Sequence, residues 1–167
     1  MGMYPGGNII RVTPTLSTDA YADADVLFAP IELPNIVPSR GGVSLITNVF
    51  VIDKERQTCD FDIHLHESSI SLGTVNATAN VSHDDYTSAN LIGCWRIDSD
   101  QGEVEDLDNL RVHAAMNIGG GNNRWSPMLI KAAGGATSIY ASAHINGGTP
   151  TYAADSLQLI FNVQYLG

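Results

Sequence analysis

Apolar and polar residues alternate along most of the chain, and this period of two is typical of β-strands with one buried face. The segment 43–53, VSLITNVFVID, shows the alternation over its whole length. It predicts one apolar face made of Val43, Leu45, Thr47, Val49 and Val51, with Ile46, Phe50 and Ile52 interspersed on the other. About eight to ten short strands are expected, within the segments 8–16, 25–37, 43–53, 60–68, 91–98, 110–118, 127–133, 137–145 and 156–166.

Turn signals such as SRGG, KERQT, AGGA and INGGTP separate these segments. Short strands with frequent turns indicate a β-sandwich or barrel. We therefore expect a single all-β domain over residues 9–167, a jelly-roll-like sandwich rather than an immunoglobulin-like one. Residues 1–8 are expected to form a flexible N-terminal arm. Only 84–92, DDYTSANLI, has room for a helix, so the fold should contain at most one short helix.

Composition and charge narrow the range of partners. The chain has 167 residues, 44% of them hydrophobic, which suits a packed globular domain. Its formal net charge is −10, from 18 acidic and 8 basic side chains, and acids outnumber bases in both halves. Binding to nucleic acid or to an anionic membrane needs a basic surface. We therefore expect neither nucleic acid nor a membrane as partner.

The termini and the cysteines predict a soluble protein made in a cytoplasm. The N-terminal MGMYPGGNII has no basic region followed by an apolar run, so no signal peptide is expected. The apolar runs are far shorter than the roughly 18 residues of a transmembrane helix. Cys59 and Cys94 are too few for a disulfide scaffold and are expected to be buried free thiols.

The stretch DFDIHLHES, 60–68, holds the strongest candidate for metal chemistry, because His64 and His66 are two residues apart on one strand. Alternation places Phe61, Ile63 and Leu65 in the core and both imidazoles, with Asp60 and Asp62, on the outer face. Cupin-type enzymes use such a histidine pair, but they also need a glutamate about four residues later, and Ile70 stands there. We therefore expect a solvated strand face where Asp and His pair weakly, and no metal site.

The remaining polar motifs favour structural roles. His83, Asp84 and Asp85 look like the polar start of the short helix, where carboxylates favour the positive end of the helix dipole. The acidic segment 98–108 lacks the ligand spacing of a twelve-residue calcium loop. No serine or cysteine has the setting of an activated nucleophile, and His113 and His144 fall in strand patterns. We expect no catalytic residue, no cofactor and no enzymatic activity.

Trp95 and Trp125 differ in their surroundings. Trp95 lies in an apolar strand and is expected in the core, whereas Trp125 follows GGGNNR in a predicted loop. An indole at a loop tip can anchor a binding partner. It could stack on a sugar or insert into a neighbouring subunit, and the sequence leaves both open.

Four segments resemble parts of a known group of proteins. These are TDAYADADVL at 18–27, SLGTVNA at 71–77, the pair IG at 92–93, and GTPTY at 148–152. In this order they resemble small virion structural proteins of tailed bacteriophages that infect marine bacteria and cyanobacteria, described as head decoration or capsid cement proteins. No single segment is specific, but together they span most of the chain.

The resemblance implies a β-sandwich that assembles, commonly as a homotrimer, on the outer face of a viral capsid and stabilises it. The implied partners are the phage major capsid protein and further copies of the chain, the implied location is the capsid exterior, and assembly takes place in the host cytoplasm. Two segments are the expected contact regions, the N-terminal arm with Met3, Tyr4, Pro5 and Ile9, and the loop with Asn122, Arg124 and Trp125. The alternative function is a tail- or fibre-associated sandwich that binds host glycans.

Overall fold

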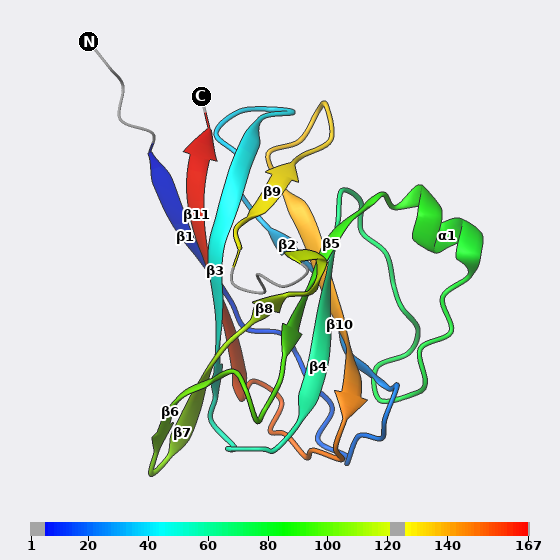
Figure 1. The fold of residues 1–167 in the computed structure, drawn as a ribbon. Helices are drawn as coiled ribbons and strands as arrows, with labels where there is room; N and C mark the ends of the chain where they lie inside the picture. The colour runs from blue at the N-terminus through cyan, green and yellow to red at the C-terminus, as the bar shows by residue number, and fades with distance from the viewer. Residues whose placement is uncertain (1–5, 121–125, 167) are drawn as a thin grey trace.

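The computed structural model describes residues 6–120 and 126–166 and confirms an all-β sandwich with one short α-helix (Figure 1). The strands of this part of the chain are β1(Gly7–Val12), β2(Val26–Leu33), β3(Val43–Asp53), β4(Asp60–His66), β5(Leu91–Ile97), β6(Glu103–Leu107), β7(Leu110–Ala114), β8(Met116–Asn117), β9(Met128–Lys131), β10(Ile139–Gly147) and β11(Leu157–Leu166). The helical elements are α1(His83–Ser88) and the short 3-10 helix η1(Ile118–Gly120). Within the described residues, no helix has the length and apolar character needed to cross a membrane.

The strands form two antiparallel sheets. One, the β3 sheet, has the order β1-β11-β3-β7-β6, with β9 also paired to β3; the other, the β4 sheet, has the order β2-β10-β4-β5-β8. Eight strands remain when β6, β8 and β9 are set aside. Numbered one to eight along the chain, these are β1, β2, β3, β4, β5, β7, β10 and β11. The β3 sheet then has the order 1-8-3-6, and the β4 sheet has the order 2-7-4-5. The chain therefore alternates between the sheets as in two Greek keys, which is the predicted jelly-roll-like arrangement.

Each of the nine predicted strand segments contains a strand, but β6 was missed. Its sequence, EVEDL, lies in the acidic segment 98–108, where the charges hide the alternation. Only two residues separate β6 from β7, which makes a β-hairpin that pairs Leu107 with Leu110. The predicted strand 110–118 is divided at Ala115, between β7 in one sheet and β8 in the other.

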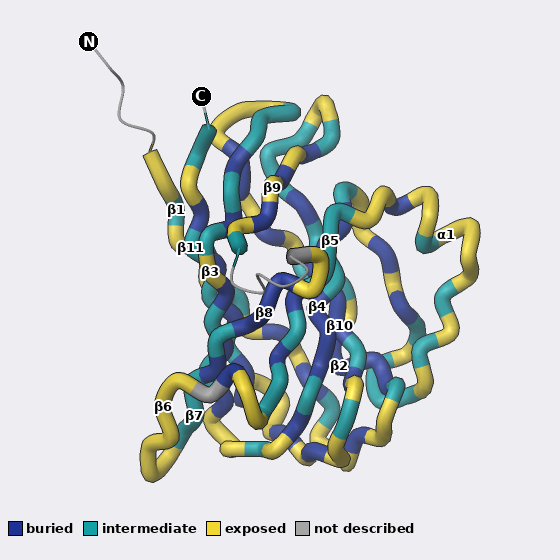
Figure 2. Tube along the Cα trace, in the orientation of Figure 1, coloured by how far each residue is buried: buried dark blue, intermediate teal, exposed yellow. Residues whose placement is uncertain are grey.

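The core lies between the two sheets and is filled by large side chains from both. In Figure 2 the buried parts of the trace lie mainly between the sheets. Phe28 and Trp95 come from the β4 sheet and Phe161 from the β3 sheet, and all three are buried. The expected core position of Trp95 is confirmed. Cys59 is a buried free thiol and Cys94 a half-buried one.

The prediction that one face of β3 carries Val43, Leu45, Thr47, Val49 and Val51 was wrong. Ile46, Val49 and Val51 are buried, whereas Val43 and Leu45 are only half-buried on the outer side. The reason is a register shift between β3 and β11, at Asn162 and Val163. A β-bulge adds a residue to one strand and so exchanges the two faces beyond it.

Helix α1 confirms the role expected for 83–85. Ser82 is the N-cap, and its hydroxyl accepts a hydrogen bond from the Asp85 amide at 3.1 Å. Asp84 and Asp85 occupy the first turn, at the positive end of the helix dipole. The helix ends at Ser88 and β5 begins at Leu91, so the helix is shorter than the predicted segment.

Three of the four segments that carry the resemblance meet at one end of the sandwich. Tyr21 packs edge-on against Tyr152, with ring centroids 6.2 Å apart. The Tyr21 hydroxyl accepts a hydrogen bond from the Ser17 amide at 2.7 Å and donates one to the Leu27 carbonyl at 2.9 Å. The Val26 amide donates to the Ala77 carbonyl at 2.9 Å. The segments 18–27, 71–77 and 148–152 therefore hold the loops at this end of the sandwich against each other.

Replacement of Tyr21 by Phe is expected to lower the free energy of unfolding by about 1–3 kcal/mol, because the buried Leu27 carbonyl loses its donor. Urea denaturation followed by tryptophan fluorescence measures the change. Tyr140→Phe, on the half-buried Tyr140 of β10, is the matched control and should change stability by less than about 0.5 kcal/mol. Equal effects of the two substitutions would contradict the role given to Tyr21.

Candidate functional site

The outer face of β4 is not a solvated strand face, which corrects the sequence prediction. Phe61, Ile63 and Leu65 fill the core as expected, but His66 is only 1% exposed on the opposite face. The connection 67–90, which includes α1, lies beside this face at the right of Figure 1. Alternation identifies which residues share a face, but it cannot reveal that a later segment covers that face.

His64 is the centre of a polar cluster under this cover. Its Nδ1 lies 2.8 Å from the Tyr86 hydroxyl of α1, and its Nε2 lies 2.9 Å from Nδ1 of His144 on β10. The Cys94 Sγ is 3.5 Å from His64 Nδ1. His66 packs its ring edge-on against Tyr86, with centroids 4.9 Å apart. The cluster thus ties the strands β4 and β10 to the helix that covers them.

Burial keeps the central imidazoles uncharged. Burial, followed by the repulsion of His144, lowers the pKa of His64 to about 4. Burial also lowers the pKa of His66, whose buried Nε2 has no hydrogen-bond partner among the described residues. The 2.9 Å contact between His64 and His144 needs one ring nitrogen to donate and the other to accept, which two neutral rings can satisfy.

The cluster is poorly arranged for metal or nucleophilic chemistry. His64 Nε2 and His144 Nδ1 point at each other, and the Cys94 sulfur lies on the other side of the His64 ring. Among the residues that the structure describes, no three His, Cys, Asp or Glu side chains are grouped so that they could hold a metal ion. Burial raises the pKa of the Cys94 thiol to about 11, which disfavours the nucleophilic thiolate. The cluster instead holds the connection 67–90, through Tyr86, against the outer face of the β4 sheet.

Asp62, also on the outer face of β4, pairs with arginine and not with histidine. Arg96 Nε and Nη2 donate to its two carboxylate oxygens at 2.7 and 2.8 Å. Asn146 adds a longer hydrogen bond of 3.3 Å. A planar guanidinium that meets a carboxylate with two parallel bonds fixes the geometry of both strands. The pair is therefore a link between β4 and β5.

The acidic segment 98–108 uses its carboxylates within the chain. Asp98 accepts hydrogen bonds from the amides of Asp100 and Gln101, both at 3.0 Å, and so stabilises a turn. Asp106 pairs with Arg56 at 2.8 Å and with Arg111 at 3.3 Å. These two arginines lower the pKa of Asp106. The segment thus contains a strand and its neighbouring turn; Asp98 stabilises the turn and Asp106 is ion-paired.

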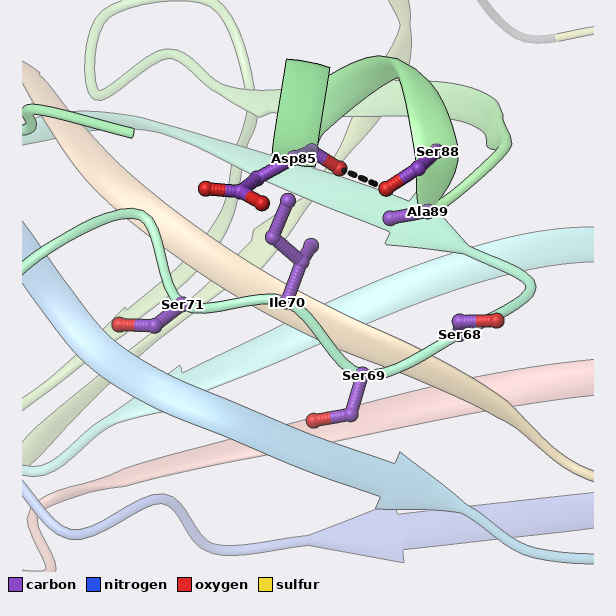
Figure 3. A pocket seen from close by; sticks show the side chains of 7 residues that line it. All are labelled: Ser68, Ser69, Ile70, Ser71, Asp85, Ser88 and Ala89. Carbon is purple, nitrogen blue, oxygen red and sulfur yellow. Dashed lines mark hydrogen bonds between the residues drawn. The ribbon is translucent and has the colours of Figure 1, made fainter. Parts of the chain in front are cut away.

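A cleft of about 320 Å³ lies between α1 and the segment that follows β4 (Figure 3). Its lining is formed by Ser68, Ser69, Ile70, Ser71, Asp85, Ser88 and Ala89. The Ser88 hydroxyl donates to the Asp85 carbonyl at 3.0 Å, and the Ser71 hydroxyl donates to the Gly73 carbonyl at 2.9 Å. The Asp85 carboxylate accepts from Ser82 at 2.6 Å. The cleft offers hydroxyls but no base aimed at any of them.

The outer face of the β3 sheet differs from these sites because many of its outward side chains are apolar. Its outward apolar side chains include Ile9, Leu45, Phe50, Ile52, Val112, Ala114, Leu129 and Ile160; Thr47, Asn48, Gln158, Asn162, Gln164 and Lys131 also point outward. Ile9 is 52% exposed and Leu129 is 60% exposed. A shallow depression of about 550 Å³ over β1, β11 and β3 lies on the same side, lined in part by Ile9, Thr47 and Asn162. We call this surface the β3 face.

Of the predicted contact residues, the structure places Ile9 on the β3 face. Met3, Tyr4 and Pro5 lie outside the described residues, as do Asn122, Arg124 and Trp125. The rest of the β3 face was missed by sequence reasoning. The signal was available in 43–53, where both faces of a single strand are apolar, since a strand with only one buried face should carry polar residues on the other.

No family model, no curated protein and no solved structure matches the chain.

Stability should depend on pH through the histidine cluster. The folded chain keeps His64 neutral down to a pKa of about 4, against an ordinary value of 6.5. Between these pH values the unfolded chain binds more protons, so the free energy of unfolding falls as the pH is lowered from about 6.5 towards 4. We expect a loss on the order of 1–3 kcal/mol from this group, measured by urea denaturation at a series of pH values.

His64→Gln should flatten this dependence, whereas His83→Gln should leave it as in the unmodified protein. His83 is the matched control because its side chain is 92% exposed, on the covering helix itself. Identical pH profiles for the two variants would exclude His64 as the origin of the acid sensitivity.

Proposed function

We propose that this protein is a phage capsid decoration protein, which binds the outer surface of the major capsid protein lattice and stabilises the head. It does so as a homo-oligomer, without transforming a substrate. The resemblance of the segments 18–27, 71–77, 92–93 and 148–152 to decoration and cement proteins is the source of the proposal.

The observation that carries the proposal is the β3 face. An apolar patch on the surface of a folded domain is typical of a site where another molecule binds. A protein that works by assembly needs this kind of surface. The clusters found elsewhere, around His64 and Asp62, are occupied with fastening parts of the chain to each other.

Charge fits the same proposal. A net charge of −10 keeps free copies soluble before assembly and disfavours binding to the packaged DNA. On a lattice, one oligomer makes several modest contacts at once. After the first contact has formed, the effective local concentration for the second is high, so the overall affinity exceeds that of any single contact. Affinity of this kind comes from the area of the contacts and from their number, and it needs no reactive side chain.

The test is binding of the purified protein to expanded capsids of the phage that encodes it, prepared without this protein. Co-sedimentation with saturation at a fixed ratio to the capsid protein is expected, with a higher temperature of capsid disruption. Removal of residues 1–5 should weaken binding at least about threefold, because Met3, Tyr4 and Pro5 belong to the expected contact region. Leu91→Asp, at an exposed position of β5, is the control and should bind normally.

Absence of co-sedimentation, together with unchanged capsid stability, would exclude the decoration role. Glycan binding in the same preparation would instead favour the tail- or fibre-associated alternative.

A further inference from the structure

We infer that copies of this chain associate with each other through the β3 face, with the β1 edge of one copy beside the β6 edge of the next. This deepens the proposed function and rests on its premise that the protein works by assembly. It names a second copy of the chain as the partner that covers this face.

The strand register shows that the apolar side chains form continuous rows across the sheet. Phe50 of β3 lies between Ile160 of β11 and Ala114 of β7. In the next row, Ile52 lies opposite Val112. Cross-strand neighbours on one face are about 5 Å apart, so the side chains of a row are in contact. The centre of the β3 face is therefore an apolar patch around Phe50 and Ile52, bordered by Gln158 and by the row of Asn48 and Asn162.

The two sheets differ in whether another segment of the chain covers their outer face. The β4 sheet has its outer face covered by the chain itself, with His64 and His66 under Tyr86. In Figure 1, α1 and its connection lie on the far side from β1, β11 and β3, so they do not reach the β3 face. Subunit interfaces of permanent homo-oligomers are apolar and poor in charge, whereas transient interfaces resemble the rest of the surface.

Charge restricts where two copies of the chain can meet. Each copy carries −10, so two copies repel each other over most of their surface. On the β3 face, the outward positions of β3, β7 and β11 hold no charged side chain among the described residues, and Lys131 of β9, beside Val43, adds a basic charge rather than an acid. This face is thus where two copies can approach without bringing acids together.

The two edges of the face carry opposite charges. Arg11 projects outward at the β1 edge, opposite Ile160, and Glu105 projects outward at the β6 edge, opposite Val112. Exposed apolar residues flank them, with Ile9 on β1 and Leu107, 49% exposed, on β6. Placing the β1 edge of one copy beside the β6 edge of the next brings Arg11 towards Glu105, because the two residues lie in neighbouring rows of the sheet. A closed pair or a closed ring both satisfy this contact.

Arg11 and Glu105 cannot pair within one copy. The strands β11, β3 and β7 lie between β1 and β6, which puts the two edges roughly 19 Å apart. An effect of one residue on the other therefore reports a contact between copies, which allows a charge-exchange experiment.

Sedimentation velocity and light scattering of the full chain over 1–100 µM, without capsids, test the inference. The unmodified protein should be a closed oligomer of two or three copies. Phe50→Glu should weaken self-association at least tenfold, while Leu91→Glu, at a position 47% exposed on the β4 sheet, should have no effect. Circular dichroism and urea denaturation show whether both variants fold.

The charge exchange makes the test specific to the proposed arrangement. Arg11→Glu and Glu105→Arg should each weaken self-association about three- to tenfold, and the double variant should recover most of the affinity. A monomeric unmodified protein at 100 µM, or a double variant no better than the single ones, would overturn the inference.

The capsid experiment separates this inference from the proposed function. A monomer whose capsid binding is abolished by Phe50→Glu would identify the capsid protein as the partner of the β3 face and overturn self-association alone. An oligomer that follows the charge exchange but does not bind capsids would support self-association and remove the decoration role.

Discussion

Packing of the two sheets against each other is the constraint on which the rest of the structure depends. It buries the inner faces of the sheets around Phe28, Trp95 and Phe161, and each sheet still has an outer face that must be solvated or covered. A sheet face can be solvated if its side chains are polar, covered by the chain itself, or covered by another molecule. The two sheets of this protein use different solutions.

The β4 sheet is covered by its own chain, at the cost of burying polar groups. His64, His144 and Tyr86 satisfy one another by hydrogen bonds, and Asp62 is satisfied by Arg96. Burying such groups costs free energy unless each has a partner. Two atoms of this face, Nε2 of His66 and Oγ of Ser142, are buried without a hydrogen-bond partner among the described residues.

The fold class could be predicted from the sequence because alternation and turn residues are local signals, and each predicted strand segment contains a strand. Three features could not. The strand β6 was hidden because consecutive acids, Glu105 and Asp106, hide the alternation; Asp106 pairs with Arg56 and Arg111. The bulge in β3 depends on the register with β11, which is set by residues more than a hundred positions away. The cover over His66 depends on where α1 docks, which periodicity does not encode.

The segments that carry the resemblance report on the fold more than on function. Tyr21, Tyr152 and the 71–77 turn hold one end of the sandwich together, so any protein with this loop arrangement would favour similar residues. Fold alone does not imply function. The functional argument therefore rests on the β3 face, which the resemblance did not reveal.

The two outer faces also separate stability from assembly. The two histidines whose pKa values are lowered, His64 and His66, lie on the β4 side, while the centre of the β3 face carries no charged side chain among the described residues. Mild acid therefore acts on the cover and not on the rows around Phe50. The apolar centre of the proposed contact is screened little by salt and changes little with pH, since neither Phe50 nor Ile160 titrates, whereas the Arg11–Glu105 pair at its edges is screened by salt. The proposed assembly through the β3 face can thus keep its apolar centre while the opposite side of the same domain loosens.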